Sequence, residues 1–172
     1  YWVSVGDSPL YLYRDGTLRQ LNEDHSMAPQ IDHLVSTGKI TEDAGQNYPD
    51  RHCLTSVLIG QQIPRVDCPK EPLTLLPDDI VIVASDGLQF LEDYEIANLL
   101  EECRDKSSAE ISTALLKSLE MLADPGQDNV AFCVIRAAAI AAAACAQPTP
   151  QIVQGASSRK PHPRKEAEYH VG

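Results

Sequence analysis

The chain has 172 residues, enough for one domain of ordinary size, and its 43% hydrophobic and 23% charged residues exclude an intrinsically disordered protein. Residues 1–136 hold 10 basic and 23 acidic residues, a net charge of −13, whereas residues 137–172 hold 4 basic and 2 acidic residues, a net charge of +2. An acidic body repels phosphates, which argues against non-specific nucleic-acid binding and suits a host for hard cations.

No apolar run reaches the roughly 18 residues that a membrane-spanning helix needs, since the longest, residues 137–146, is Ala-rich and too short. No signal peptide is visible and the first residue is not Met, so we expect a piece of a longer chain or a processed product. The cysteines are odd in number, widely spaced and without a CxxC pair, which predicts reduced thiols and a cytoplasmic location. They are Cys53, Cys68, Cys103, Cys133 and Cys145.

The first part of the chain predicts strands followed by a helix. Three segments rich in β-forming residues predict strands, at residues 2–5, 10–13 and 17–21. Asp15-Gly16 supplies the turn of a hairpin between the second and third of these segments. A helix can begin at Pro29 and end at Gly38, and Thr41 opens a further short turn of helix.

The second part of the chain contains the clearest periodicity. Four segments predict strands, at residues 63–68, 73–76, 80–84 and 130–135. The last two are continuous apolar runs, which indicates strands buried on both faces. Apolar residues at helical spacing predict helices over residues 93–103 and 107–122. Because strands and helices do not alternate along the chain, their order predicts an α+β or layered αββα arrangement.

Two aspartates stand at the ends of the two apolar strands. Asp86 follows the first strand and precedes a glycine, and Asp128 comes just before the second. If these strands pair antiparallel, both carboxylates meet at one rim of the sheet, where hard oxygen ligands suit Mg²⁺ or Mn²⁺. A second interpretation stays open, because Asp-Gly and Asp-Asn pairs also form turns without binding a metal. Asp7, in a Gly-Asp-Ser turn, allows the same two interpretations.

Six short segments stand out by their order along residues 1–136. They are Val5-Gly6-Asp7-Ser8 with the hairpin that follows it, Leu21-Asn22-Glu23-Asp24-His25-Ser26, Gly38-Lys39-Ile40-Thr41, Arg51-His52-Cys53-Leu54-Thr55, Ser85-Asp86-Gly87-Leu88 and Gly126-Gln127-Asp128-Asn129-Val130. In this order they resemble the motifs of the protein phosphatase 2C (PPM) family, the metal-dependent serine/threonine phosphatases. Each segment alone is a weak signal, but six of them in the order of the family are specific.

The resemblance implies a fold and a division of the chain. The family fold is an α+β sandwich of the αββα type, in which antiparallel sheets are flanked by helices, and here its N-terminal part is missing. Residues 1–136 would be the C-terminal part of the catalytic domain. Residues 137–172 would form a tail that is Ala-rich and helical at first, then Pro-rich, basic and disordered after Gln147.

The resemblance also implies a reaction and its cofactors. The family hydrolyses phosphoserine and phosphothreonine in proteins with a water that two metal ions, Mg²⁺ or Mn²⁺, activate. Asp86 and Asp128 match ligands of this metal pair, and Asp7 matches the residue that, with Asp86, holds a weaker third ion. The implied partner is a phosphorylated protein. Neither a nucleic acid nor a membrane is expected as a partner. No phosphoenzyme is needed, so we assign no residue of this chain as a catalytic nucleophile.

The remaining family motifs do not occur in this chain. The other metal ligands, the arginine that binds substrate phosphate and the acid histidine lie upstream in the family, so we expect the chain alone to be inactive. Pro9 stands where the family usually has arginine. One alternative is a truncated pseudophosphatase that binds a protein partner without catalysis, and a Ca²⁺-binding domain is disfavoured because no EF-hand loop is visible. We interpret His25, His33 and His52 as surface or hydrogen-bonded residues rather than ligands.

Overall fold

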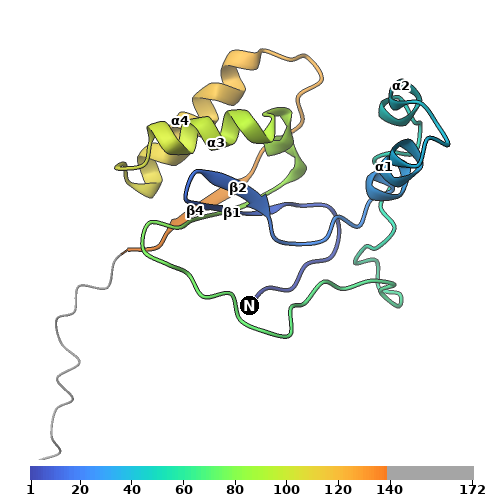
Figure 1. Cartoon of the computed structure of the whole chain (residues 1–172), viewed down its shortest axis with the longest axis horizontal. Helices are drawn as coiled ribbons and strands as arrows, with labels where there is room; N and C mark the ends of the chain where they lie inside the picture. The colour runs from blue at the N-terminus through green and yellow to red at the C-terminus, as the bar shows by residue number, and fades with distance from the viewer. Residues whose placement is uncertain (139–172) are drawn as a thin grey trace, which may run out of the picture. The chain divides into compact units, whose positions relative to one another are not determined.

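The structure, a computed structural model, describes residues 1–138 (Figure 1). Cys145 and the predicted disorder after Gln147 lie outside the described residues, and the division of the chain at residue 136 stays a prediction. The helices and strands in chain order are β1 (Leu10–Arg14), β2 (Thr17–Gln20), α1 (Ala28–Ser36), α2 (Glu42–Gln46), β3 (Ile80–Ala84), the 3₁₀ helix η1 (Asp86–Phe90), α3 (Asp93–Glu102), α4 (Ser108–Leu122) and β4 (Phe132–Arg136). Among the described residues, no helix is both long and apolar enough to cross a membrane.

Four antiparallel strands form one sheet in the order β2-β1-β3-β4. β3 lies between β1 and β4, which fits its run of β-branched residues, since such side chains pack well on a pleated surface. Its register on β4 pairs Ile82 with Val134 and Ala84 with Phe132. The antiparallel pairing predicted for the two apolar strands is therefore confirmed, and so is the α+β class.

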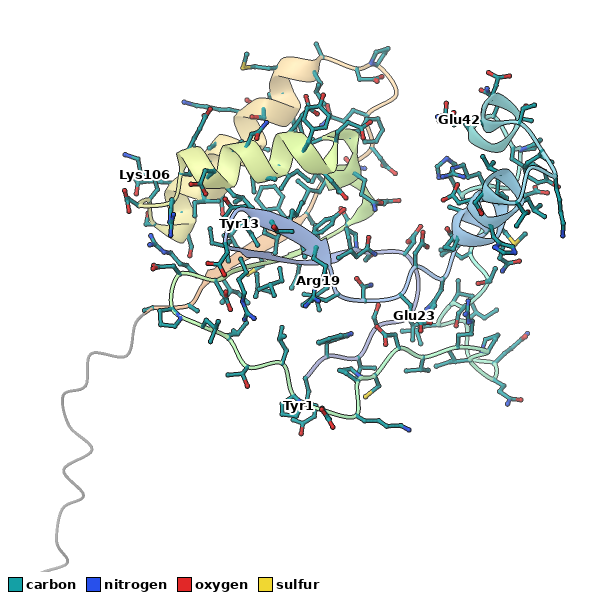
Figure 2. All side chains as sticks on the ribbon, viewed as in Figure 1. Tyr1, Tyr13, Arg19, Glu23, Glu42 and Lys106 are labelled. Carbon is teal, nitrogen blue, oxygen red and sulfur yellow. The ribbon has the colours of Figure 1, made fainter. Side chains whose placement is uncertain are left out.

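The helices α3 and α4 cover one face of the sheet and form the core with it (Figure 1). Tyr11, Tyr13 and Ile82 project from this face, and the Tyr13 hydroxyl donates a hydrogen bond to the carboxylate of Glu101 on α3 (Figure 2). The two helices contribute fully buried residues at a spacing of four, namely Ile96 and Leu100 on α3 and Ile111, Leu115 and Leu119 on α4. Each such side chain contributes about 1.5–3 kcal/mol by leaving water. The helical periodicity of the sequence is confirmed here.

The opposite face of the sheet is partly open, so the prediction that the two apolar strands are buried on both faces is wrong. Val83 and Ile135 lie on it, and each has 47% of its surface exposed. Leu12 and Val81 lie on the same face but are covered. Because soluble proteins seldom leave large apolar side chains grouped on an open sheet face, this face suits packing against a second sheet, as the sandwich of the family resemblance implies.

Of the strands predicted at residues 63–68 and 73–76, the second is wrong, and the first is reduced to a single bridge with the segment predicted as a strand at residues 2–5. Residues 47–79 contain no helix or strand, and Asp67 forms an isolated antiparallel bridge with Ser4. Prolines explain the difference, because proline has no N–H to extend a ladder of hydrogen bonds. The prolines in or beside the two segments are Pro64, Pro69, Pro72 and Pro77.

Candidate metal site

The β3–β4 pairing continues beyond the ends of both strands. The Ser85 N–H donates to the Ala131 carbonyl at 2.8 Å, and the Ala131 N–H donates to the Ser85 hydroxyl at 3.0 Å. Gly87 then packs against the backbone of Asn129, where an added Cβ would lie 2.5 Å from the carbonyl oxygen. Only glycine leaves room for this approach, because backbone atoms cannot move aside as the end of a flexible side chain can. Two distant segments are thus held side by side where the two predicted ligands stand.

Asp86 and Asp128 lie in different local structures next to these paired segments. Asp86 opens η1, where the chain turns after β3, and its side chain is exposed. Asp128 is also exposed and lies in the turn before β4, where its Oδ1 accepts a hydrogen bond from the Asn129 N–H at 2.6 Å. Within residues 1–138 neither carboxylate forms an ion pair with a cationic side chain, so both are open to a cation from solution.

Asp7 reaches the same place from the turn before β1. The Pro9 carbonyl accepts a hydrogen bond from the Ala84 N–H at 3.0 Å, so this turn lies against the end of β3. Burial raises the pKa of Asp7 most, and the carboxylates of Asp86 and Asp24 raise it further. The ionised form of Asp7 is therefore disfavoured here, and a nearby cation would favour it.

A pocket of about 470 Å³ opens beside these residues. The three predicted aspartates line it together, and its remaining lining residues are His52, Gln89, Phe90 and Gly126. Carboxylates around one pocket repel one another unless a cation lies between them, and their hard oxygens are the ligands that Mg²⁺ and Mn²⁺ prefer. Among the described residues, no group of three or more His, Cys, Asp or Glu side chains is gathered closely enough to hold a metal ion by itself. The carboxylates fit a divalent cation but form only part of a ligand set, and their role as ligands stays a prediction.

His52, like Gln89 and Phe90, lines the pocket although the sequence assigned it no role there, whereas its predicted place at the surface is confirmed. It is exposed, it follows α2 in an irregular segment, and it lowers the pKa of Asp7. Its position depends on a distant contact, because the Thr55 N–H and hydroxyl each donate to the His25 carbonyl at 2.7 Å. No periodicity signals such a contact, although the segment resembles a family motif. His25 itself is buried and hydrogen-bonded, and His33 is exposed, as the sequence suggested.

Known proteins similar to this chain are bacterial protein phosphatases. No protein-family model matches the chain. It is 33% identical over 106 residues to the serine/threonine phosphatase stp of Listeria welshimeri, and the matched region covers 61% of this chain and 40% of that protein. It is 29% identical over 136 residues to the serine/threonine protein phosphatase PstP of Mycobacterium tuberculosis, and the matched region covers 77% of this chain and 24% of that protein.

Solved structures give the same result. The PPM Ser-Thr phosphatase MsPP of Mycobacterium smegmatis, in complex with cacodylate, is 32% identical with a TM-score of 0.52, over 80% of this chain and 55% of that one. The serine/threonine phosphatase of S. agalactiae is 25% identical with a TM-score of 0.59, over 78% of this chain and 53% of that one. The resemblance to PPM-type phosphatases is thereby confirmed. The chain spans 40% or less of these curated relatives and about half of these structures, so the match covers only part of each of these proteins.

We predict that Gly87→Ala destabilises the chain by about 1–3 kcal/mol, because the added methyl group meets backbone atoms of Asn129 that cannot relax. The midpoint of urea unfolding measures the loss. Gly126→Ala is the matched control in the same pocket, because its Cβ would meet only an Asp124 side-chain oxygen, at 3.3 Å. The control should change stability by less than about 1 kcal/mol. A Gly87→Ala chain as stable as the wild type would contradict the close backbone contact.

A second prediction concerns the pH dependence of folding. The pKa of Asp7 is raised above its ordinary value of 3.8, so the folded chain holds this proton more tightly than the unfolded chain does. Stability due to Asp7 is therefore greatest at low pH and is lost as the pH rises from about 3.8 through the folded pKa. The metal-free Asp7→Asn variant should resist urea better than the wild type at pH 7, and this advantage should vanish below pH 3.8.

Asp105→Asn is the control for this measurement, because Asp105 is exposed and away from the pocket lining. It should match the wild type at both pH values. If Asp7→Asn is the less stable chain at pH 7, the sign of the electrostatic argument is wrong.

Proposed function

We propose that this chain is the C-terminal part of the catalytic domain of a metal-dependent phosphatase that hydrolyses phosphoserine and phosphothreonine in proteins. The observation that carries the proposal is the convergence of Asp7, Asp86 and Asp128 on one pocket from three separate segments. The relatives named as serine/threonine phosphatases support the reaction type. Cacodylate, an oxyanion that resembles phosphate, is bound in the M. smegmatis phosphatase and supports an oxyanion substrate.

Mg²⁺ or Mn²⁺ fits the chemistry of the pocket. Asp86 and Asp128 would supply oxygen ligands to a pair of ions, and Asp7 together with Asp86 would hold a weaker third ion. The pKa of Asp7, raised first by burial and then by neighbouring carboxylates, supports this assignment, because a cation would favour the ionised form. When bound, such ions lower the pKa of a water and offset the negative charge of a phosphoryl group.

The chain's own residues act by position and charge. The contact between Gly87 and Asn129 sets the separation of the two segments, and the Ser85 hydroxyl ties the end of β3 to the chain entering β4. Asp86 and Asp128 are exposed, so a phosphorylated side chain on the surface of another protein can reach them. The ligands, the phosphate-binding arginine and the acid histidine that the resemblance places upstream must come from outside this chain.

The proposal includes a cytoplasmic location and a phosphorylated protein as the partner. Oxidising compartments favour disulfides, whereas thiols stay reduced in the cytoplasm. Four cysteines among the described residues are free, which supports this location, and they are Cys53, Cys68, Cys103 and Cys133.

A hybrid phosphatase tests the proposal. The part of the Listeria welshimeri phosphatase that precedes the matched region, joined ahead of this chain, would supply the missing ligands. We predict Mn²⁺-dependent hydrolysis of p-nitrophenyl phosphate by the hybrid and none by the 172-residue chain alone. Asp86→Asn or Asp128→Asn should lower kcat/KM of the hybrid on the order of 100-fold, because each removes a charged ligand of the ions that activate water.

Asp105→Asn is again the matched control, and it should leave the activity of the hybrid unchanged. Turnover by the 172-residue chain alone would contradict its dependence on upstream residues. A folded hybrid without activity would instead favour the alternative function, a pseudophosphatase that binds a partner without catalysis.

A further inference from the structure

His25 connects the two parts of the pocket that do not come from β3 and β4. It lies between β2 and α1 and is fully buried, with 0% of its surface exposed. Its backbone N–H donates to the Gly6 carbonyl at 3.1 Å, and its Nδ1 accepts a hydrogen bond from the Gly6 N–H at 3.2 Å. One residue therefore bonds both backbone polar groups of Gly6, which directly precedes Asp7.

These two hydrogen bonds hold an unusual backbone conformation. Gly6 has φ = +104°, which residues with a side chain rarely adopt. No atom lies within 4 Å of the place that a Cβ of Gly6 would occupy, so side-chain packing at that place does not hold the turn. The Asn22 side chain also holds this stretch, through bonds to the Ser4 hydroxyl, the Ser8 carbonyl and the Leu10 N–H, but at Gly6 itself the turn depends on the two hydrogen bonds with His25.

The carbonyl of His25 holds the second part of the pocket. It accepts hydrogen bonds from both the N–H and the hydroxyl of Thr55, and the nearby Met27 N–H donates to the Cys53 carbonyl at 3.0 Å. These bonds fix the segment that carries His52 into the pocket. His25 is therefore hydrogen-bonded both to the Asp7 turn and to the segment that carries His52.

The two ring nitrogens of His25 have different surroundings. Because Nδ1 accepts from Gly6, the proton of the neutral ring lies on Nε2. Nε2 is buried without a hydrogen-bond partner, and a Glu23 carboxylate oxygen (Figure 2) lies 3.8 Å away and equally far from the guanidinium of Arg65. The Nε2–H donor is buried without a partner, which costs free energy. The stabilising hydrogen bond of the ring is therefore the one that Nδ1 accepts.

We propose that His25 is a positioning residue for the cation that Asp7 holds, acting through Nδ1 on the turn at Gly6. This inference rests on the proposed function, since Asp7 matters here as a metal ligand. It assigns the role to one ring nitrogen, so a side chain with an acceptor in the same place should replace histidine. Asparagine has such an acceptor in Oδ1, whereas glutamine carries its amide one carbon further out, near the position of Nε2.

Titration of the 172-residue chain with Mn²⁺, followed by electron paramagnetic resonance, tests this role. His25→Asn should bind Mn²⁺ within about twofold of the wild type, and His25→Gln about fivefold more weakly, the effect of one lost hydrogen bond. His33→Gln, at an exposed histidine of α1, is the control and should bind as the wild type does. In the double variant Asp7→Asn/His25→Gln, the affinity should equal that of Asp7→Asn alone, because His25 acts through Asp7.

Equal affinities of the His25→Asn and His25→Gln variants, or additive losses in the double variant, would overturn the inference and leave the proposed function standing. Mn²⁺ binding that does not respond to Asp86→Asn would overturn the proposed function, and this inference with it. If His25→Gln does not fold, His25→Asn decides the question together with hydrogen exchange at the Gly6 amide. If the Gly6 amide in His25→Asn is protected from exchange as in the wild type, and the variant binds Mn²⁺ with wild-type affinity, the role of Nδ1 is supported. Loss of either the protection or the affinity overturns it.

Discussion

The antiparallel pairing of β3 with β4 is the contact on which the site depends. It joins segments that are far apart in the chain, and the Ser85 hydroxyl and the contact of Gly87 with Asn129 extend it beyond the last ladder pair. Because the two backbones touch at Gly87, their separation is set by van der Waals contact and cannot shrink. The same strands carry the core beneath α3 and α4, so Asp86 and Asp128 stand at an anchored rim of the sheet.

Asp7 is held in place differently from Asp86 and Asp128, so the two sides of the pocket differ in how firmly they are fixed. Asp86 and Asp128 depend on strand pairing and on the apolar core, whereas Asp7 depends on a short turn held by hydrogen bonds with His25 and Asn22. A turn held by a few hydrogen bonds opens at a lower free energy than a core strand does. The Asp7 turn and the loop that carries His52 are therefore the adjustable side of a pocket whose other side is fixed.

Sequence reasoning succeeded where the physical signal is local. The strand at β3 was predictable from its β-branched run, and α4 from its apolar spacing. The antiparallel pairing then placed Asp86 beside Asp128. Sequence reasoning failed between residues 47 and 79, where short apolar runs favoured strands that the prolines prevent. It placed His52 at the surface but not in the pocket, because that position depends on hydrogen bonds to a residue distant in the chain.

We propose that Asp86 and Asp128 hold the same pair of divalent cations. Paramagnetic broadening of backbone amide resonances by Mn²⁺ tests it most directly, because the broadening falls off steeply with distance from the ion. The account predicts that the amides of Asp86 and Asp128 broaden at the same Mn²⁺ concentration, that the amide of Asp105 does not, and that Asp86→Asn removes the broadening at Asp128. Broadening at only one of the two aspartates, or broadening at Asp128 that survives Asp86→Asn, would contradict it.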